Sequence, residues 1–241
     1  MQKSIPLNLR HVLTLVAGLL ILKVTLSVVL GYRDYFPANF ASDFLQGRED
    51  YFFGPYQWAF YTHVVSGPIA LVLGLLLVSE AVRTGFPKWH RRLGKVLAFV
   101  VLTLVAPSGL WMARYAQSGP VAAVGFSGLA IATGGCILLG WRSAVKRRFP
   151  EHRRWMWRCF LLLSSAVIVR MVGGLATVLA VGAVWIYPLT AWVSWLVPLA
   201  AYEFTRAVRR SSRPAGVETQ RQFPAPAVDS PWFAVESMAR R

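Results

Sequence analysis

Residues 58–79 read WAFYTHVVSGPIALVLGLLLVS and contain no Asp, Glu, Lys or Arg. The hydrocarbon core of a bilayer is about 30 Å thick, and an α-helix needs about 20 apolar residues to cross it. The stretch therefore predicts a membrane-spanning helix. The rest of the chain agrees, because 56% of its 241 residues are hydrophobic, 15% are charged and the mean hydropathy is +0.48. Such a composition excludes an ordinary soluble globular domain.

Five more runs of similar length are separated by charged or Gly/Pro-rich breaks. Together the six predicted spans cover about residues 11–30, 58–79, 93–113, 121–141, 157–179 and 184–204. The sequence thus predicts an all-α, polytopic membrane helical bundle with six transmembrane helices.

The first run follows Lys3 and Arg10 and therefore has the basic start of a secretory signal. It is longer than the apolar region of a signal peptide, and it leads into LGYRDYF rather than a small-residue cleavage site. We therefore expect an uncleaved anchor.

The predicted organisation has four parts. They are an N-terminal transmembrane helix (1–31), an external aromatic and acidic loop (32–57), a five-helix membrane core (58–207) and a disordered cytoplasmic tail (208–241). Aromatic side chains favour the bilayer interface, so the loop is either a lid on the outer surface or an aromatic belt with solvated charges. The tail is rich in Pro, Ala and polar residues and has no apolar period.

Basic residues predict the orientation of the chain. They concentrate in residues 80–95, 142–158 and 206–213, and loops rich in Lys and Arg stay in the cytoplasm. Six spans with both termini in the cytoplasm put all three stretches on that side. Residues 32–57 and 114–120 then lie outside.

The net charge of +16 has two possible kinds of partner. Basic residues near the anionic inner leaflet contribute about 1 kcal/mol each to lipid contact. Nucleic acid also attracts basic proteins, but no recognisable nucleic-acid-binding motif accompanies these charges. We therefore expect the phospholipid bilayer, and no nucleic acid, as the partner of this charge.

Two similar motifs precede apolar runs, FPKWHRR at 86–92 and FPEHRR at 149–154. A helix start at Pro followed by basic residues stops translocation and anchors the chain to lipid phosphate. We therefore predict lipid or topology contacts for four residues: Arg91, Arg92, Arg153 and Arg154. The histidines of the two motifs, His90 and His152, allow a second interpretation as ligands of haem iron.

Three ionisable residues fall inside the predicted spans: Lys23, His63 and Arg170. Charge in hydrocarbon is costly, so such residues face the bundle interior and need a partner. Lys23 is close enough to the outer boundary to extend its ammonium group to water. The surroundings of Arg170 in sequence offer it no such route. We predict a polar pocket near His63 and Arg170 in the outer half of the membrane.

Haem is the sharpest hypothesis for the histidines, because b-type cytochromes hold iron between imidazoles on neighbouring helices. His63 lies near the outer side, whereas His11, His90 and His152 lie near the inner side. Only the inner group can supply two axial ligands, so His90 and His152 are the candidate haem-iron ligands. A single-His or quinone-type redox site around His63 and Arg170 stays open. Catalytic residues cannot be assigned.

Cys136 and Cys159 lie at similar depth near the inner ends of their spans, without CxxC or Cys/His spacing. The cytoplasmic side is reducing, so we interpret them as packing residues rather than a disulfide or a metal site.

Five segments together carry a family resemblance: YTHVVSGPIALVLG, FPKWHRRLGKV, APSGLWMARYA, GFSGLA and EHRRWMWRCFLLLSSAVIVR. As a set they resemble the bacterial family of predicted membrane proteins of unknown function 2306 (DUF2306), over most of residues 50–180. The resemblance implies a polytopic fold in a bacterial inner membrane and no established activity. It draws attention to these polar positions: His63, His90, Arg91, His152, Arg153, Trp155, Arg158 and Arg170.

The preferred functional hypothesis is a redox component resembling a b-type cytochrome, which uses haem or a quinone and passes electrons to a respiratory partner. A non-catalytic membrane scaffold or assembly factor is the first alternative. A small transporter of anionic solutes is the second, because proline residues can break its helices. These prolines are Pro68, Pro107, Pro188 and Pro198. Whether the protein is an enzyme stays open.

Overall fold

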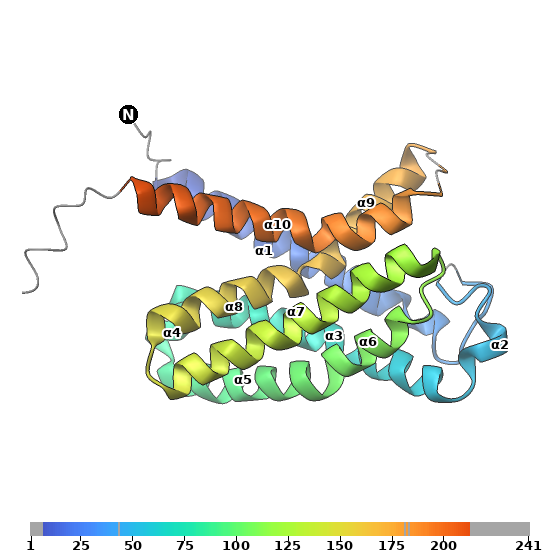
Figure 1. The fold of residues 1–241 in the computed structure, drawn as a ribbon, viewed down its shortest axis with the longest axis horizontal. Helices are drawn as coiled ribbons and strands as arrows, with labels where there is room; N and C mark the ends of the chain where they lie inside the picture. Colours follow the sequence, from blue (N-terminus) through green and yellow to red (C-terminus); the bar gives the residue numbers. More distant parts are fainter. Residues whose placement is uncertain (1–6, 43, 181, 183, 213–241) are drawn as a thin grey trace, which may run out of the picture. The chain divides into compact units, whose positions relative to one another are not determined.

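The computed structural model describes residues 7–42, 44–180, 182 and 184–212. All regular secondary structure in these ranges is helical (Figure 1), which confirms the predicted all-α class. Contacts divide the chain into one unit up to Ala200 and a second unit from Ala201. The sites below lie in the first unit.

The helices follow one another along the chain with short connections. They are α1 (Leu7–Leu30), η1 (Gly31–Asp34), α2 (Glu49–Phe52), α3 (Pro55–Val78), α4 (Glu80–Gly85), α5 (Pro87–Val100), η2 (Val101–Val105), α6 (Ala106–Ala113), α7 (Gly119–Val145), α8 (Phe149–Leu163), α9 (Ser165–Val178) and α10 (Ile186–Ser211).

Five helical stretches are long and apolar enough to cross a membrane. They are Val12–Asp34, Pro55–Val78, Pro87–Ala113, Gly119–Val145 and Phe149–Val178. Helix α10 is the sixth long helix, with 26 residues, and at 1.5 Å per residue it exceeds the thickness of a bilayer core. It is less apolar than the other five because it contains Trp, Tyr, Pro and a basic last turn. The arrangement is consistent with six spans.

Helices α5 and α8 begin earlier than the apolar runs predict. Each starts at a Phe-Pro pair, and Pro fits the first helical turn because no N–H is needed there. The backbone N–H of His90 donates to Phe86 O, and that of His152 to Arg148 O, each at 2.9 Å. Both histidines therefore lie in the first turn of a helix.

Four helical segments form the packed bundle. Helix α3 contacts α5, η2, α6 and α8, and α7 contacts the same neighbours from the opposite side. In the described chain α3 and α7 make no contact with each other, and neither do α5 and α8, so each pair is diagonal. Their apolar side chains meet in one core cluster that includes Leu71, Leu97, Ile137, Phe160 and Leu163.

Glycines let α7 approach its neighbours closely. A Cβ on Gly140 would lie 2.9 Å from Met156 Sδ on α8, and one on Gly125 would lie 3.0 Å from Trp192 Nε1 on α10. The same Trp192 Nε1 donates to Val121 O at 3.1 Å. These contacts hold α8 and the first half of α10 against α7.

The predicted span 157–179 is interrupted. Helix α8 ends at Leu163 and α9 begins at Ser165. Ser164 Oγ donates to Phe160 O at 2.8 Å, a side-chain bond that competes with the helical ladder. The apolar pattern runs through this break, which is why the sequence does not reveal it.

A second cluster, the aromatic end of the bundle, is formed by buried Leu45, Phe52, Tyr56 and Phe60. Residues 31–42 and 44–54 pack there against the start of α3 and against residues at and after the end of α6, and Tyr61 Oη donates to Tyr35 O at 2.9 Å. Gln117 Nε2 donates to Gln46 O at 2.7 Å. The segment predicted as an external loop is thus a folded cap on this end.

Candidate functional site

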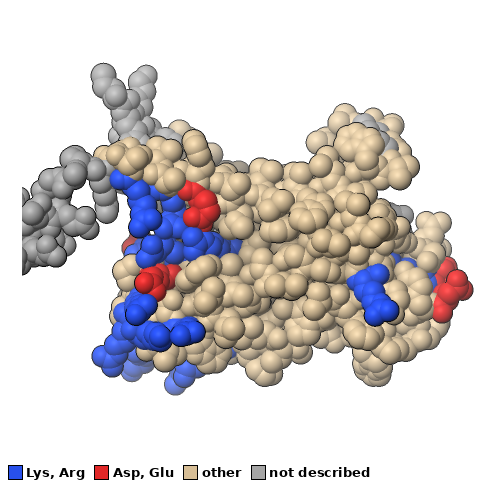
Figure 2. All heavy atoms as spheres, viewed as in Figure 1, with Lys and Arg blue, Asp and Glu red and all other residues tan. Residues whose placement is uncertain are grey.

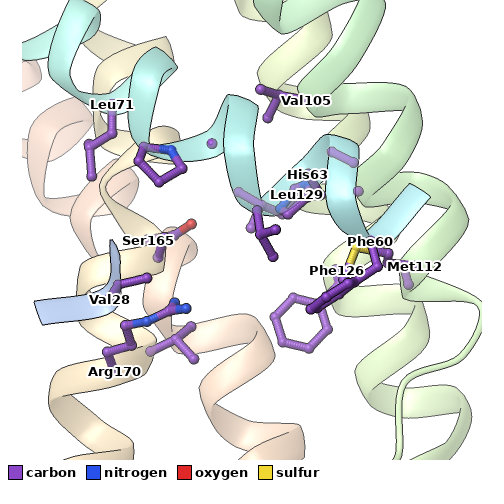
Figure 3. Close-up of a pocket in the computed structure, with 18 of the residues that line it drawn as sticks. Val28, Phe60, His63, Leu71, Val105, Met112, Phe126, Leu129, Ser165 and Arg170 are labelled. Atoms are coloured by element: carbon purple, nitrogen blue, oxygen red, sulfur yellow. The ribbon is translucent and has the colours of Figure 1, made fainter. Parts of the chain in front are cut away.

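A cavity of about 280 Å³ lies beside the aromatic end and is lined by α1, α3, η2, α6, α7, α8, α9 and α10 together with the cap. Pockets of roughly 300–1,000 Å³ hold drug-sized ligands, so this one suits a small ligand or a headgroup. Figure 3 shows Arg170 and Ser165 on one side, with His63, Phe60 and Met112 on the other. The polar lining residues are Thr25, Tyr32, Tyr35, Arg48, Tyr56, His63, Tyr115, Thr133, Ser165, Arg170 and Tyr187. Among the described lining residues none is Asp or Glu.

His63 is held in one tautomer. Its Nδ1 lies 3.1 Å from Ser108 Oγ, and the Ser108 hydroxyl donates to carbonyl oxygens of its own helix, Leu104 O and Val105 O. A serine has a single hydrogen, so its oxygen accepts from His63 and Nδ1 carries the proton. The lone pair of Nε2 is then available to a ligand in the cavity.

A π-turn places Ser108. Pro107 has no N–H and crowds the carbonyl four residues earlier, so the preceding turn widens. The N–H of Ala106 accordingly donates to Val101 O, five residues back. The widened turn, η2, lies next to α3. A Cβ on Gly109 would lie 3.0 Å from His63 Cε1, so a larger residue at position 109 would press on the imidazole ring.

Tyr32 anchors the end of the first span to α3. Pro68 lies inside α3 and cannot donate to the carbonyl of Val64. The Tyr32 hydroxyl donates to that oxygen instead. Pro68 thus leaves the Val64 carbonyl without its helical donor, and the side chain of Tyr32, which lines the cavity, supplies a donor in its place.

Arg48 is buried at 2% exposure and lines the cavity from the cap. Its Nε donates to Phe44 O at 2.6 Å, and its Nη1 donates to Tyr51 Oη at 2.9 Å and to Tyr115 O at 3.2 Å. The guanidinium also lies 4.5 Å from the centre of the Phe44 ring. Hydrogen bonds and a π-face therefore compensate its desolvation.

Arg170 differs from Arg48. It lines the same cavity as His63 and Tyr32, from α9. Within the described part of the chain its guanidinium makes no hydrogen bond and no ion pair. A cation in this position calls for an anionic or carbonyl-bearing partner.

His90 and His152 lie at the other end of the bundle, on α5 and α8 respectively. The structure therefore separates them from His63. His152 Nδ1 lies 2.9 Å from Gly140 O, while His90 Nδ1 is buried without a hydrogen-bond partner.

Basic side chains surround these histidines. Figure 2 shows Lys and Arg gathered at one end of the bundle, while the middle of the visible face carries no charged residue. We call this the basic end, formed by Arg83, Lys88, Arg91, Arg92, Lys95, Arg142, Lys146, Arg147, Arg148, Arg153 and Arg154. A charge-free middle between two polar ends is the pattern of a membrane protein.

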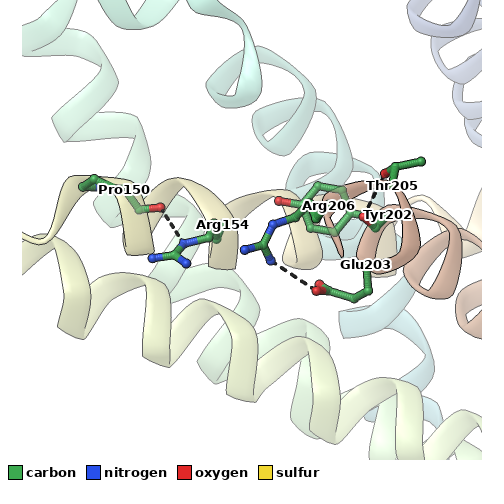
Figure 4. A network of polar contacts seen from close by, with 6 residues as sticks. All are labelled: Pro150, Arg154, Tyr202, Glu203, Thr205 and Arg206. Atoms are coloured by element: carbon green, nitrogen blue, oxygen red, sulfur yellow. Dashed lines mark hydrogen bonds and ion pairs between the residues drawn. The ribbon is translucent and has the colours of Figure 1, made fainter. Parts of the chain in front are cut away.

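The predicted lipid contacts differ in exposure. Arg91, Arg92 and Arg153 are exposed, and Arg154 is half-buried, with Nε donating to Pro150 O at 3.2 Å (Figure 4). Arg92 lies 5.7 Å from the centre of the Trp89 ring. Their contact with lipid stays a prediction.

The second unit contains one ion pair of its own among its described residues. Arg206 Nη1 lies 3.1 Å from Glu203 Oε2 (Figure 4). Residues i and i+3 face each other on a helix surface, so this pair neutralises one charge locally. The predicted tail from 208 begins within α10, and residues 213–241 lie outside the described residues.

Other predicted positions take no part in the cavity. Lys23 is exposed on α1 and is not a lining residue. His11 belongs to α1, but its side chain lies outside the described part. Cys136 and Cys159 are buried in the apolar core cluster.

Several cavity residues were not predicted from the sequence. Arg48 resembles an ordinary loop charge, and nothing near it in sequence indicates burial. Ser108 and Gly109 follow a proline in an apolar run. A proline there predicts a bend in the helix but not which residue the bend contacts. Tyr32 is one aromatic among many at a predicted interface. Contacts across more than 30 residues define each of these roles.

Comparison with known proteins supports the membrane assignment. Neither the curated proteins nor the solved structures contain a match to this chain. The model of one family, described as predicted membrane protein (DUF2306), matches residues 60–205. That range includes most of the cavity, both Phe-Pro motifs and the bundle helices from the second turn of α3 onward. Since more than half of the chain matches, the protein belongs to the DUF2306 family of predicted membrane proteins.

Proposed function

We propose that this protein is a redox component of a bacterial inner membrane that binds a quinone-type molecule in the cavity beside the aromatic end. The observation that carries the proposal is that one largely apolar cavity is lined both by His63 and by Arg170, which has no hydrogen-bond or ion-pair partner among the described residues. A quinone ring needs apolar walls, donors for its carbonyl oxygens and an acceptor for the hydroxyl protons of its reduced form.

His63 is suited to accept a proton. Its Nδ1–H is engaged by Ser108, so the lone pair of Nε2 serves a ligand hydroxyl. Oxidation of a bound quinol to the quinone releases two protons and two electrons. Nε2 takes the first hydroxyl proton, the second proton passes to solvent, and both electrons reduce a respiratory partner outside this chain. This proton transfer is ordinary general-base chemistry.

Arg170 is suited to hold the opposite charge. The N–H groups of its guanidinium have no acceptor among the described residues. They stabilise the oxyanion that forms when the quinol loses a hydroxyl proton. The hydroxyl groups of Tyr35 and Tyr56 line the same cavity. Arg48 keeps the cap in place, because its Nε and Nη1 donate to Phe44 O, Tyr51 Oη and Tyr115 O.

The test is equilibrium binding of a short-chain benzoquinone to the full-length protein in detergent. We expect His63→Ala and Arg170→Ala each to weaken binding by about tenfold to a hundredfold, since a hydrogen bond to a charged group contributes about 1.5–3 kcal/mol. Lys23→Ala is the matched control for Arg170, because it removes a cation from a span without touching the cavity. His90→Ala is the matched control for His63.

Unchanged affinity in both cavity variants, with folded protein, contradicts the quinone proposal. Loss of uptake of an anionic solute in Arg170→Ala vesicles, without quinone binding, favours a transporter. No binding and no uptake in any variant favours a scaffold or assembly factor.

A further inference from the structure

The cavity is long and narrow. Its lining residues on α3 recur on one face of the helix, from Tyr56 through Phe60, His63 and Gly67 to Leu71. At 1.5 Å per residue, the distance from Tyr56 to Leu71 along the helix axis is about 22 Å. A volume of about 280 Å³ spread over that length suits an elongated ligand rather than a round one.

The two ends of the cavity differ in polarity. Tyr56 and Phe60 belong to the aromatic end, where the Arg48 guanidinium also lines the cavity. The opposite end reaches the apolar core cluster of the bundle. We call it the apolar arm, and its residues are Val24, Leu71, Val105, Leu162 and Leu163. An amphiphilic ligand, with a polar head towards the cap and an apolar tail in the arm, matches this gradient.

The cavity opens beside α9. Among its described lining residues three are exposed, namely Ala166 and Arg170 on α9 and Tyr187 on α10. Ala166 and Arg170 are one helical turn apart, and both belong to Phe149–Val178, a stretch able to cross a membrane. At the depth of Ala166 the opening therefore faces the bilayer, so a ligand enters from lipid.

Helix α1 borders this opening. It contacts α9, and no residue of α1 whose side chain the structure describes is buried. The Tyr32 hydroxyl fixes α1 to α3 near the aromatic end, whereas Val24 and Val28 line the cavity further along with apolar side chains. A tail can thus lie between α1 and α9 without displacing a hydrogen bond of the cavity wall.

These features specify the kind of quinone. We propose that the ligand is a lipid quinone, whose ring lies between His63 and Arg170 and whose long apolar tail starts in the apolar arm and leaves for the bilayer at Ala166. A cavity of about 280 Å³ cannot enclose a long tail, so the tail has to continue into lipid. This inference rests on the proposed function, because the ring must first bind at His63 and Arg170.

The test compares two compounds that share one ring. They are 2,3-dimethoxy-5-methyl-1,4-benzoquinone and the same ring with a decyl chain, titrated against the full-length protein in phosphatidylcholine nanodiscs. We expect the decyl compound to displace the short one from the wild-type protein, because an open cavity accepts the tail. Affinities of variants are compared with the wild type for the same compound, so that partition into lipid cancels.

Gly67→Leu tests the apolar arm. Gly67 lines the cavity one turn beyond His63, and a Cβ there would meet no atom within 4 Å, so a leucine fills the cavity without a clash. We expect it to weaken binding of the decyl compound about tenfold more than binding of the short one. Gly135→Leu is the matched control, since a Cβ there also meets no atom and the residue does not line the cavity.

Ala166→Trp tests the opening. The alanine is exposed, so the larger side chain narrows the opening without overpacking the core. We expect association and release of the decyl compound to slow by about tenfold, measured by stopped-flow mixing. Val178→Trp is the matched control, because Val178 is exposed on the same helix and does not line the cavity.

Three results overturn this inference while the quinone proposal stands. They are binding of the short compound without displacement by the decyl compound, equal weakening of both compounds in Gly67→Leu, and unchanged rates in Ala166→Trp. Binding of neither compound to folded wild-type protein contradicts the quinone proposal itself, and the lipid-quinone inference with it. Size-exclusion profile and helical circular dichroism show which variants are folded.

Discussion

At the scale of single residues, the cavity depends on how one imidazole is held. Ser108 Oγ accepts a hydrogen bond from the Nδ1–H of His63, and Gly109 leaves room for the imidazole ring. The hydroxyl of Ser108 and the absence of a Cβ at Gly109 thus determine which ring nitrogen of His63 faces a ligand. The identity of His63 alone does not determine this, because neutral imidazole has two tautomers.

Gly109→Ala tests this arrangement. The new Cβ would lie 3.0 Å from His63 Cε1, so the ring must move. Overpacking of a buried site costs about 1–3 kcal/mol. We expect lower thermal stability together with weaker benzoquinone binding, measured by thermal unfolding in detergent and by equilibrium titration.

Gly135→Ala is the control for that substitution. A Cβ there meets no atom within 4 Å, and the residue also lies in a membrane helix. Equal effects of the two substitutions would mean that helix propensity, rather than the position of His63, accounts for the change.

At the scale of helices, prolines create backbone defects that side chains repair. Pro68 frees the carbonyl of Val64, and the Tyr32 hydroxyl donates to it. Pro107 widens the helix into the π-turn η2, next to which Ser108 meets His63. Two of the four prolines that suggest a transporter from sequence thus shape the helices around the cavity, and one of them, Pro68, lines it.

A double-mutant cycle tests the repair by Tyr32. Tyr32→Phe leaves the buried Val64 carbonyl without a donor, which costs about 1–3 kcal/mol. In the Pro68→Ala background the backbone N–H of residue 68 is available to that oxygen, so the same substitution should cost much less. Thermal unfolding of the four proteins gives the coupling. Equal costs of Tyr32→Phe in both backgrounds would show that the hydroxyl does not serve this carbonyl.

At the scale of the whole molecule, charge separates the two ends of the bundle. The basic end carries the histidines of α5 and α8, and the aromatic end carries Arg48 and the cap. We propose that the basic end faces the cytoplasm, since loops rich in Lys and Arg are retained there.

Labelling of single cysteines tests the orientation. Cys136 and Cys159 are buried, so they give little background. We expect Lys88→Cys and Arg148→Cys to react with a membrane-impermeant maleimide only after the membrane is opened. Phe53→Cys, which replaces an exposed residue of the cap, should react in intact cells. Labelling of positions 88 and 148 from opposite sides would refute the topology.

Much of the fold follows from composition and pattern. Charged side chains are expensive in hydrocarbon, so long charge-free runs identify the spans, and the structure confirms an all-helical membrane architecture. The exact starts of α5 and α8 do not follow from hydropathy, because their first turns are basic. The break at Ser164 does not follow either, because both sides of it are apolar.

Hydropathy alone is enough to identify a helical membrane protein and the segments that lie in the bilayer, because the lipid acts on each residue independently of its neighbours. It also indicates His63 and Arg170 as polar groups within the spans. What these groups meet depends on the packing of the helices. His63 contacts Ser108 across 45 residues of sequence, and Arg48 contacts Tyr115 across 67. Such contacts require particular helix faces to pack together. The apolar pattern of a membrane helix does not determine which faces these are, because helices in a membrane pack through the close fit of small residues.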